Sequence, residues 1–154
     1  MKLSIREMKQ EDYRGVRLVD ELTQRQYLGL RWDRFSESEK ESHLKSRLSE
    51  FEANLNTGYC FVAVINKKMI GFVFAHEMLP FRGKLYIRHI AVHPDYQGQG
   101  MGPLLYKKLI EKAKRTQITE IAALINIDNP QSIKLHEKAG FILKDRKEAI
   151  LKVL

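Results

Sequence analysis

The sequence predicts an α/β domain built on one mixed sheet with flanking helices. In the first half, the β-rich runs 59–65 and 69–76 are joined only by Asn66-Lys67-Lys68, which is typical of a hairpin. In the second half, strand and helix patterns alternate, which indicates crossover connections and a mixed sheet. A chain of 154 residues without repeats or linkers is expected to form one domain, residues 1–154.

The elements expected first along the chain are a short strand at 3–6 and two helices. Apolar residues recur at helical spacing after Asp12 and predict the first helix. Ser36 and Glu39 have the spacing of a capping box, which opens the second helix, and residues 56–58 end it. The apolar stripes of the two helices are Val16, Val19, Leu22 and Leu28, and then Leu44, Leu48, Phe51 and Leu55.

A third β-rich run at 85–92 follows the hairpin. The elements expected after it are a helix over 103–115, a strand over 118–126, a helix over 131–139, and strands over 141–145 and 147–153. The last two strands would complete the sheet.

The composition limits the classes of partner. Lys and Arg number 27 against 19 Asp and Glu, a net charge of +8 that suits an anionic ligand. Acidic residues interrupt the basic clusters and aromatic residues are not interleaved with them, so solvated helix faces are favoured over specific nucleic-acid binding. No apolar run approaches a membrane span, and the first residues are too polar for a secretory signal, which predicts a cytoplasmic protein.

Cysteine and metal chemistry are not expected to contribute. The one cysteine, Cys60, lies in an apolar run, where a small buried hydrophobic residue is favoured over a reactive thiol. The acidic and histidine residues show no metal-ligand spacing, so no metal site is predicted.

The segment 97–102, Gln97-Gly98-Gln99-Gly100-Met101-Gly102, carries the main functional signal. It joins an apolar strand ending in Ile90-Ala91-Val92 to a helix. Glycines let backbone N–H groups approach an anion closely, and the helix adds unpaired N–H groups and the positive end of its dipole. The alternatives are a plain connection or a dinucleotide-binding turn, although the glycines lack the G-x-G-x-x-G spacing of the latter.

Two motifs in the last half of the chain resemble the GNAT N-acetyltransferase superfamily. The first is Ile90-Ala91-Val92-His93-Pro94 with the glycine segment, and the second is 129–132 followed by 135–141. The resemblance implies two central strands that splay apart, and acetyl-CoA as cosubstrate for acetylation of a primary amine on a small molecule or peptide. The implied cofactor-binding residues are Ile90, Ala91, Val92, Gln97, Gly98, Gln99, Gly100, Met101, Gly102, Asn129, Ser132 and His136.

The resemblance also implies catalytic positions. His136 replaces the tyrosine that most family members use to protonate the departing thiolate, so it is either that acid or a wall of the cofactor site. Tyr86 and Arg88 match positions that often carry the base, and neither is an ordinary base at neutral pH. Glu77 could act through a water or be a solvated strand end, while His89 is expected in the core.

Acceptor recognition remains open in the sequence. Strand alternation places Tyr86, Arg88 and Ile90 on one face, where Arg88 could hold an acceptor carboxylate. The turn 27–35 matches the family's acceptor wall, or packs on the sheet. The missing base leaves a non-catalytic coenzyme A-binding module as an alternative, and the oligomeric state could be monomer or homodimer.

Overall fold

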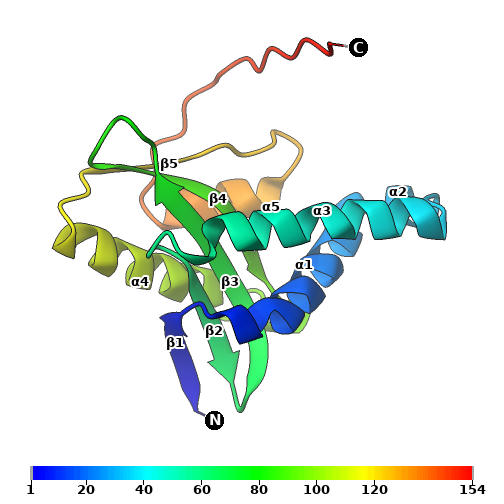
Figure 1. Cartoon of the computed structure of the whole chain (residues 1–154), viewed down its shortest axis with the longest axis horizontal. Coiled ribbons are helices and arrows are strands. Elements are labelled where there is room, and N and C mark those ends of the chain that lie inside the picture. Colours follow the sequence, from blue (N-terminus) through cyan, green and yellow to red (C-terminus); the bar gives the residue numbers. More distant parts are fainter. Residues whose placement is uncertain (1, 154) are drawn as a thin grey trace.

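A computed structural model of the protein describes residues 2–153, except for the side chain of Ser46. Its centre is a five-stranded sheet in the order β1-β2-β3-β4-β5 (Figure 1). The first four strands are antiparallel, and β5 is parallel to β4. The strands are β1 (Leu3–Glu7), β2 (Phe61–Ile65), β3 (Lys68–Glu77), β4 (Lys84–Val92) and β5 (Glu120–Ala123).

Helices cover both faces of this sheet and create two apolar clusters. Side chains of α1 and α3 pack with Phe72, Phe74 and Ala91 on one face, and those of α4 pack with Val73, Leu85 and other strand residues on the opposite face. The predicted α/β fold with a mixed sheet is therefore confirmed. The helices are α1 (Tyr13–Leu28), α2 (Leu30–Asp33), α3 (Glu37–Leu55), α4 (Met101–Arg115) and α5 (Pro130–Lys138), with 3-10 turns at Gln10–Asp12 and Pro94–Tyr96.

The capping box and the hairpin turn predicted from the sequence both form in the structure. Glu39 N–H donates to the Ser36 hydroxyl at 3.2 Å and Ser36 N–H donates to the Glu39 carboxylate at 2.7 Å, so the capping box opens α3. Asn66 and Lys67 adopt φ angles of 48° and 70°, which form the tight turn of the β2–β3 hairpin. Among the described residues, no helix is long and apolar enough to cross a membrane.

The end of the predicted sheet differs from the structure. β5 spans only Glu120–Ala123, not 118–126, because β4 pairs with it only over Lys84–Ile87. The strands expected at 141–145 and 147–153 are absent, and residues 142–153 are exposed. A β-rich pattern forms a strand only where a neighbouring strand supplies hydrogen bonds, and this segment has no such neighbour in the described chain.

Candidate functional site

The sheet opens between β4 and β5. These strands pair over residues 84–87 and 120–123. Over residues 88–92, β4 has β3 on one side, and no strand of the described part of the chain pairs with it on the other. Backbone groups on the open side are available to a ligand. This is the splayed arrangement expected beside residues 90–92.

A β-bulge at Arg88 changes which side chains face each layer. The pairing with β3 skips Arg88, which has no partner residue there. Arg88 and His89 both contact side chains of α1 or α3, whereas Ile90 packs with the cluster on the α4 side. The alternation predicted for this strand, with Arg88 and Ile90 on one face, is therefore wrong.

The glycine segment forms an open loop at the start of α4, which is the candidate anion site. Gly98 and Gly100 adopt left-handed φ angles of 73° and 82°, and a Cβ at either would meet no atom within 4 Å. Gly100 is the N-cap of α4 and has no side chain to satisfy the N–H groups of the first turn. Gln97 ties the loop to β4 by donating to the Val92 carbonyl at 2.9 Å. The positive end of the α4 dipole thus faces an accessible loop.

The α4–α5 contact depends on Gly102. A Cβ there would lie 2.7 Å from Leu135 Cδ1, so a glycine lets the two helices approach without a shift of the Leu135 side chain. Asn129 caps α5, because its side-chain oxygen accepts from the N–H of Ser132 at 3.1 Å. Both motifs of the sequence therefore meet in one place, and Gly102 and Asn129 have structural roles there.

His136 is buried in this helix contact and 2% exposed. Its Nδ1 lies 2.7 Å from the Ser132 carbonyl oxygen, so this nitrogen carries the proton and donates it. Its Nε2 then accepts from the Tyr106 hydroxyl, also at 2.7 Å. Burial lowers the pKa of His136, and the ring is neutral. With both nitrogens engaged inside the protein, this geometry favours a packing role over an acid role.

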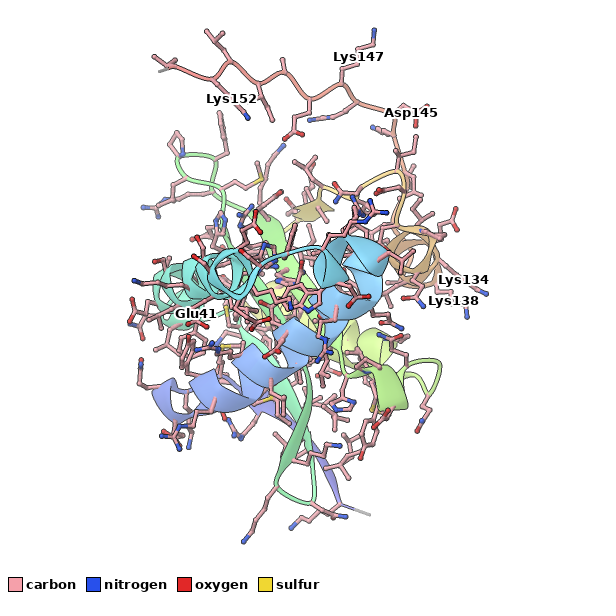
Figure 2. All side chains as sticks on the ribbon, turned by 90° about the vertical axis from the view of Figure 1, so that its right-hand side faces the viewer. Glu41, Lys134, Lys138, Asp145, Lys147 and Lys152 are labelled. Carbon is pink, nitrogen blue, oxygen red and sulfur yellow. The ribbon has the colours of Figure 1, made fainter. Side chains whose placement is uncertain are left out.

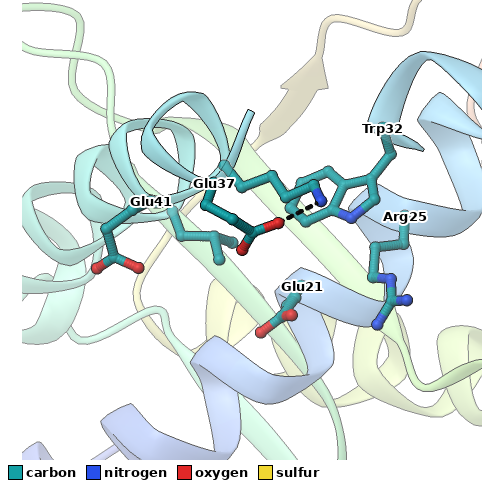
Figure 3. Close-up of a pocket in the computed structure, with 7 residues that line it drawn as sticks. Glu21, Arg25, Trp32, Glu37 and Glu41 are labelled. Carbon is teal, nitrogen blue, oxygen red and sulfur yellow. Dashed lines mark hydrogen bonds and ion pairs between the residues drawn. The ribbon is translucent and has the colours of Figure 1, made fainter. Parts of the chain in front are cut away.

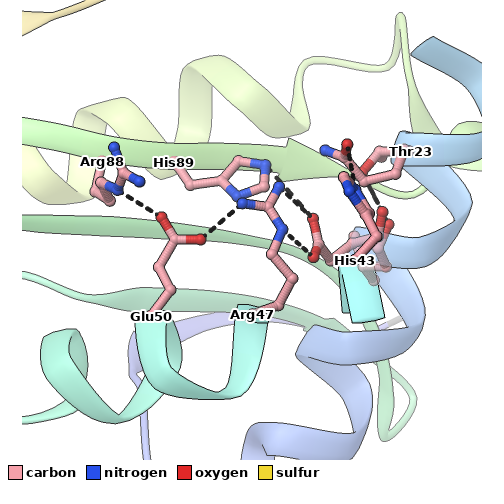
Figure 4. Close-up of polar contacts among 9 residues, drawn as sticks. Thr23, His43, Arg47, Glu50, Arg88 and His89 are labelled. Atoms are coloured by element: carbon pink, nitrogen blue, oxygen red, sulfur yellow. Dashed lines mark hydrogen bonds and ion pairs between the residues drawn. The ribbon is translucent and has the colours of Figure 1, made fainter. Parts of the chain in front are cut away.

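A chain of alternating charges crosses the opposite face of the sheet (Figure 4). Arg47 contacts Asp20 at 2.9 Å and Glu50 at 2.8 Å, and Glu50 also contacts Arg88 at 2.7 Å. The two carboxylates are almost fully buried, and Arg88 is half exposed. Glu50 contacts Arg88 at its Nε.

His89 lies beside this charge chain. Burial, with the positive charges of Arg47 and Arg88, lowers its pKa to about 3, so the ring is neutral. Its Nε2 is 3.7 Å from an Asp20 oxygen, and its ring packs edge-on against Phe72. The expectation of a core histidine agrees with this environment.

Glu77 and Tyr86 lie near the other end of the β3–β4 pair. Glu77 is opposite Leu85, which is five residues along β4 from Ile90 and roughly 16 Å away at the usual strand rise. Tyr86 packs its ring against His76 at 5.6 Å. The structure therefore does not bring these two side chains to the amides of residues 90–92, and either would need intervening water to move a proton there.

The turn predicted as an acceptor wall, 27–35, has two parts. Trp32 is 4% exposed and packs with Phe35 and His43, as the packing interpretation expects. Arg31 lies over the ring of Tyr27 at 5.6 Å. Tyr27, in the first part of the turn, contacts residues 126 and 128 before α5.

The last turn of α1 contacts the glycine loop and the segment 126–128, which precedes α5. Gln26 and Gln97 exchange amide hydrogen bonds of 2.9 and 3.1 Å. The Tyr27 hydroxyl donates to Asp128 at 2.8 Å and accepts from Asn126 at 3.1 Å. Sequence reasoning missed Gln26, Asn126 and Asp128, because each contact joins segments 71 to 101 residues apart and no local pattern marks these partners.

Two hollows accompany the site. One, of about 330 Å³, is formed by α1, α2 and α3 alone, and contains no residue of β4 or of the glycine loop (Figure 3); it is lined by Glu21, Arg25, Trp32, Glu37, Lys40, Glu41 and Leu44. The other, of about 380 Å³, is a groove between α4 and α5, lined by Pro103, Tyr106, Lys107, Ile110, Glu111, Lys114, Lys138 and Ala139. This second groove begins directly after the glycine loop.

The family model described as "Acetyltransferase (GNAT) family" matches residues 8–141, which include the open β4 edge, the glycine loop and α5. The chain belongs to the GNAT acetyltransferase family. The predicted resemblance is thus confirmed.

Two curated relatives of this GNAT chain are named for small-molecule substrates. It is 34% identical over 99 residues to an L-methionine sulfoximine/L-methionine sulfone acetyltransferase of Salmonella typhimurium, covering 62% of this chain and 58% of that protein. It is 32% identical over 101 residues to the L-amino acid N-acyltransferase MnaT of Escherichia coli, covering 64% and 59%. The matches thus span less than two thirds of each relative's length.

Solved structures support the same fold. A PaiA N-acetyltransferase of Thermoplasma acidophilum, in complex with coenzyme A, superposes with a TM-score of 0.77 and 18% identity. The superposition covers 96% of this chain and 94% of the other. At this identity the likeness concerns the fold alone.

Proposed function

We propose that this protein moves an acetyl group from acetyl-CoA to a primary amine, which attacks directly in a ternary complex. The observation that carries the proposal is the open edge of β4, which leads into a left-handed glycine loop at the start of α4. Family membership and the names of the relatives support the same reaction. Acetyl-CoA supplies the activated thioester, so no covalent enzyme intermediate is required.

The residues present fit this cosubstrate. The open space at Gly98 and Gly100 suits a pyrophosphate on the loop amides, from Gly98 to Gly102. Three lysines of the α4–α5 groove add positive charge for the nucleotide end. Amides of residues 90–92 would hold the thioester carbonyl, since donors fixed by a sheet need no reorganisation as charge develops. Asn129 would lie beside the pantetheine arm.

Proton transfer is assigned largely to water. The neutral ring of His136 is already bonded to Tyr106 and Ser132, so we assign it to packing. Glu77 and Tyr86 lie too far along the strand for direct contact with an amine held near Ile90. We further propose that residues 1–154 form one catalytic domain acting in the cytoplasm.

The acceptor class that fits best is a small amine that also carries a carboxylate. Arg88 is half exposed beside the open strand, and Glu50 fixes its orientation while leaving the terminal nitrogens for a second carboxylate. The names of the relatives include amino acids and close analogues, which supports the same class.

An acceptor panel tests both reaction and class. Thiol release from acetyl-CoA is expected with free amino acids and their analogues. We expect weaker release with spermidine and with lysine-containing peptides. Arg88→Ala should lower kcat/KM for amino acids by about 10- to 100-fold, the value of a lost charge-assisted hydrogen bond. Arg115→Ala, at the far end of α4, is the control.

The outcomes are distinct. A preference for spermidine, or unchanged selectivity in Arg88→Ala, would make Arg88 a structural residue. Coenzyme A binding without thiol release from any amine would favour the non-catalytic binding module.

His136→Phe is expected to leave kcat within about threefold of wild type while lowering stability by about 1–3 kcal/mol, because the buried Tyr106 hydroxyl loses its acceptor. Denaturant unfolding and steady-state kinetics measure the two effects. The double variant His136→Phe/Tyr106→Phe should recover part of the stability, since it removes both polar groups. A large fall in kcat in a stably folded His136→Phe protein would restore the acid role.

A further inference from the structure

The opening between β4 and β5 has a second side, formed by the segment that follows β5. Where the two strands pair, each residue of β4 has one partner in β5, and the last pair is Ile87 with Ala123. The same register would place residues 124–128 opposite residues 88–92, but the strands separate after this pair. The segment 124–128 therefore flanks the opening, across from the amides of residues 90–92.

The last turn of α1 spans this opening. Gln26 exchanges hydrogen bonds with Gln97, in the glycine loop that follows β4. Tyr27, the next residue, is hydrogen-bonded to Asp128 and Asn126 in the segment 124–128. α1 packs on one face of the sheet, and the groove between α4 and α5 lies on the other. An acceptor amine can therefore approach the opening from the face of α1, while the opposite groove remains for acetyl-CoA.

Asp128 presents a carboxylate oxygen that no cation neutralises. The amide of Asn126 donates to the Tyr27 hydroxyl at 3.1 Å, and this hydroxyl donates its own proton to Asp128 Oδ1 at 2.8 Å. In the described part of the chain, no donor or cation contacts the second oxygen, Oδ2, and the residue is exposed. Lys134 and Lys138 of α5 point outward, away from α1 (Figure 2). The free oxygen is available to a positively charged ligand.

We propose that Asp128 binds the protonated amino group of the acceptor, and that Tyr27 positions the carboxylate for this contact. The inference rests on the proposed acetyl transfer and deepens it. Aliphatic amines have a pKa of about 10 and are mostly ammonium ions at neutral pH, the form that a carboxylate binds by charge-assisted hydrogen bonds. Arg88 lies on the same face of β4, where its contacts are with α3. Together, Asp128 and Arg88 would select molecules that carry both an amine and a carboxylate.

This ion pair is expected to act on substrate binding more than on the chemical step. Water removes one proton from the ammonium, and the freed lone pair forms the N–C bond, which makes the nitrogen positive again. The C–S bond of the thioester then breaks, and the second amine proton reaches the departing thiolate through water. The contact with Asp128 is thus present in both the bound substrate and the charged intermediate. An interaction of equal strength in the two states changes KM and leaves kcat unchanged.

Asp128→Asn tests the charge, since asparagine keeps an oxygen for the Tyr27 hydroxyl. The KM of the best amino acid in the acceptor panel should rise by about 10- to 100-fold, with kcat within about threefold of wild type. Affinity for coenzyme A, measured by calorimetry, should not change. Glu52→Gln, at an exposed position of α3, is the control for loss of a carboxylate and should keep the wild-type KM.

The outcomes separate this inference from the proposed function. A wild type that acetylates no amine contradicts both. An active wild type with an unchanged KM in Asp128→Asn overturns only the role of Asp128. A fall in kcat at constant KM also overturns the binding role, because it would make Asp128 a proton acceptor.

A double-mutant cycle tests the role of Tyr27. Tyr27→Phe removes the hydroxyl and should raise the acceptor KM by about 3- to 10-fold, less than Asp128→Asn does. Because Tyr27 acts through the carboxylate, Tyr27→Phe/Asp128→Asn should be no worse than Asp128→Asn alone. Asp128→Glu, which keeps the charge, should recover part of the affinity. Additive effects of the two single changes would overturn the positioning role of Tyr27.

Discussion

Replacing Gly100 with aspartate is expected to weaken coenzyme A binding by about 100-fold or more, which corresponds to about 2.7 kcal/mol or more. Gly100 is the N-cap of α4, and its φ of 82° places it in the left-handed region. A carboxylate there would occupy the positive end of the helix and repel the phosphates of the ligand. Calorimetric titration with coenzyme A measures the loss.

Two variants separate charge from backbone strain. Gly58→Asp introduces the same side chain at a glycine with the same φ of 82° and equally open surroundings, outside the candidate site. It should lose about 1 kcal/mol of stability and keep wild-type affinity. Gly100→Asn keeps the strain without the charge, and should bind more tightly than Gly100→Asp. Wild-type affinity in Gly100→Asp would remove the phosphate-loop assignment.

The folded protein is expected to lose stability steeply in acid because of His89. Its pKa is about 3 in the folded state and 6.5 as an ordinary histidine, so between these values the unfolded chain binds more protons. The contribution of His89 to the free energy of unfolding is complete above pH 6.5. It decreases as the pH falls from 6.5 to about 3, by up to about 1.4 kcal/mol per pH unit. The groups around the ring modify this slope. The charges of Arg47 and Arg88 reinforce the lowering of the His89 pKa. Burial raises the pKa of Asp20, so protonation of Asp20 favours the folded state at pH values just above its ordinary pKa.

Urea unfolding at several pH values between 4 and 7 tests this expectation. His89→Phe preserves a ring against Phe72 and removes the titrating nitrogen, so the slope of stability against pH should decrease by about 1 kcal/mol per unit. His76→Phe, on the neighbouring strand β3, is the matched control for the histidine-to-phenylalanine change. An unchanged slope in His89→Phe would show that His89 already accepts a proton in the folded state.

The predictions that succeeded rest on interactions within short segments. The Ser36–Glu39 capping box and the Asn66-Lys67 turn depend on the conformational preferences of a few adjacent residues. The predictions that were wrong rest on strand pairing. The bulge at Arg88 has no glycine or proline to mark it, and the segment 142–153 has a strand pattern without a strand beside it.

The sequence by itself determined the mixed α/β fold, the family and the position of the candidate phosphate loop, because local propensity and motif spacing encode them. Only the tertiary structure decided the state of individual side chains. It paired Glu50 with Arg88, buried His136 against Tyr106, and joined Gln26 to Gln97. These contacts connect residues 30 to 71 positions apart in the sequence. Their energies depend on burial and on charges contributed by distant segments, and no local sequence pattern encodes either.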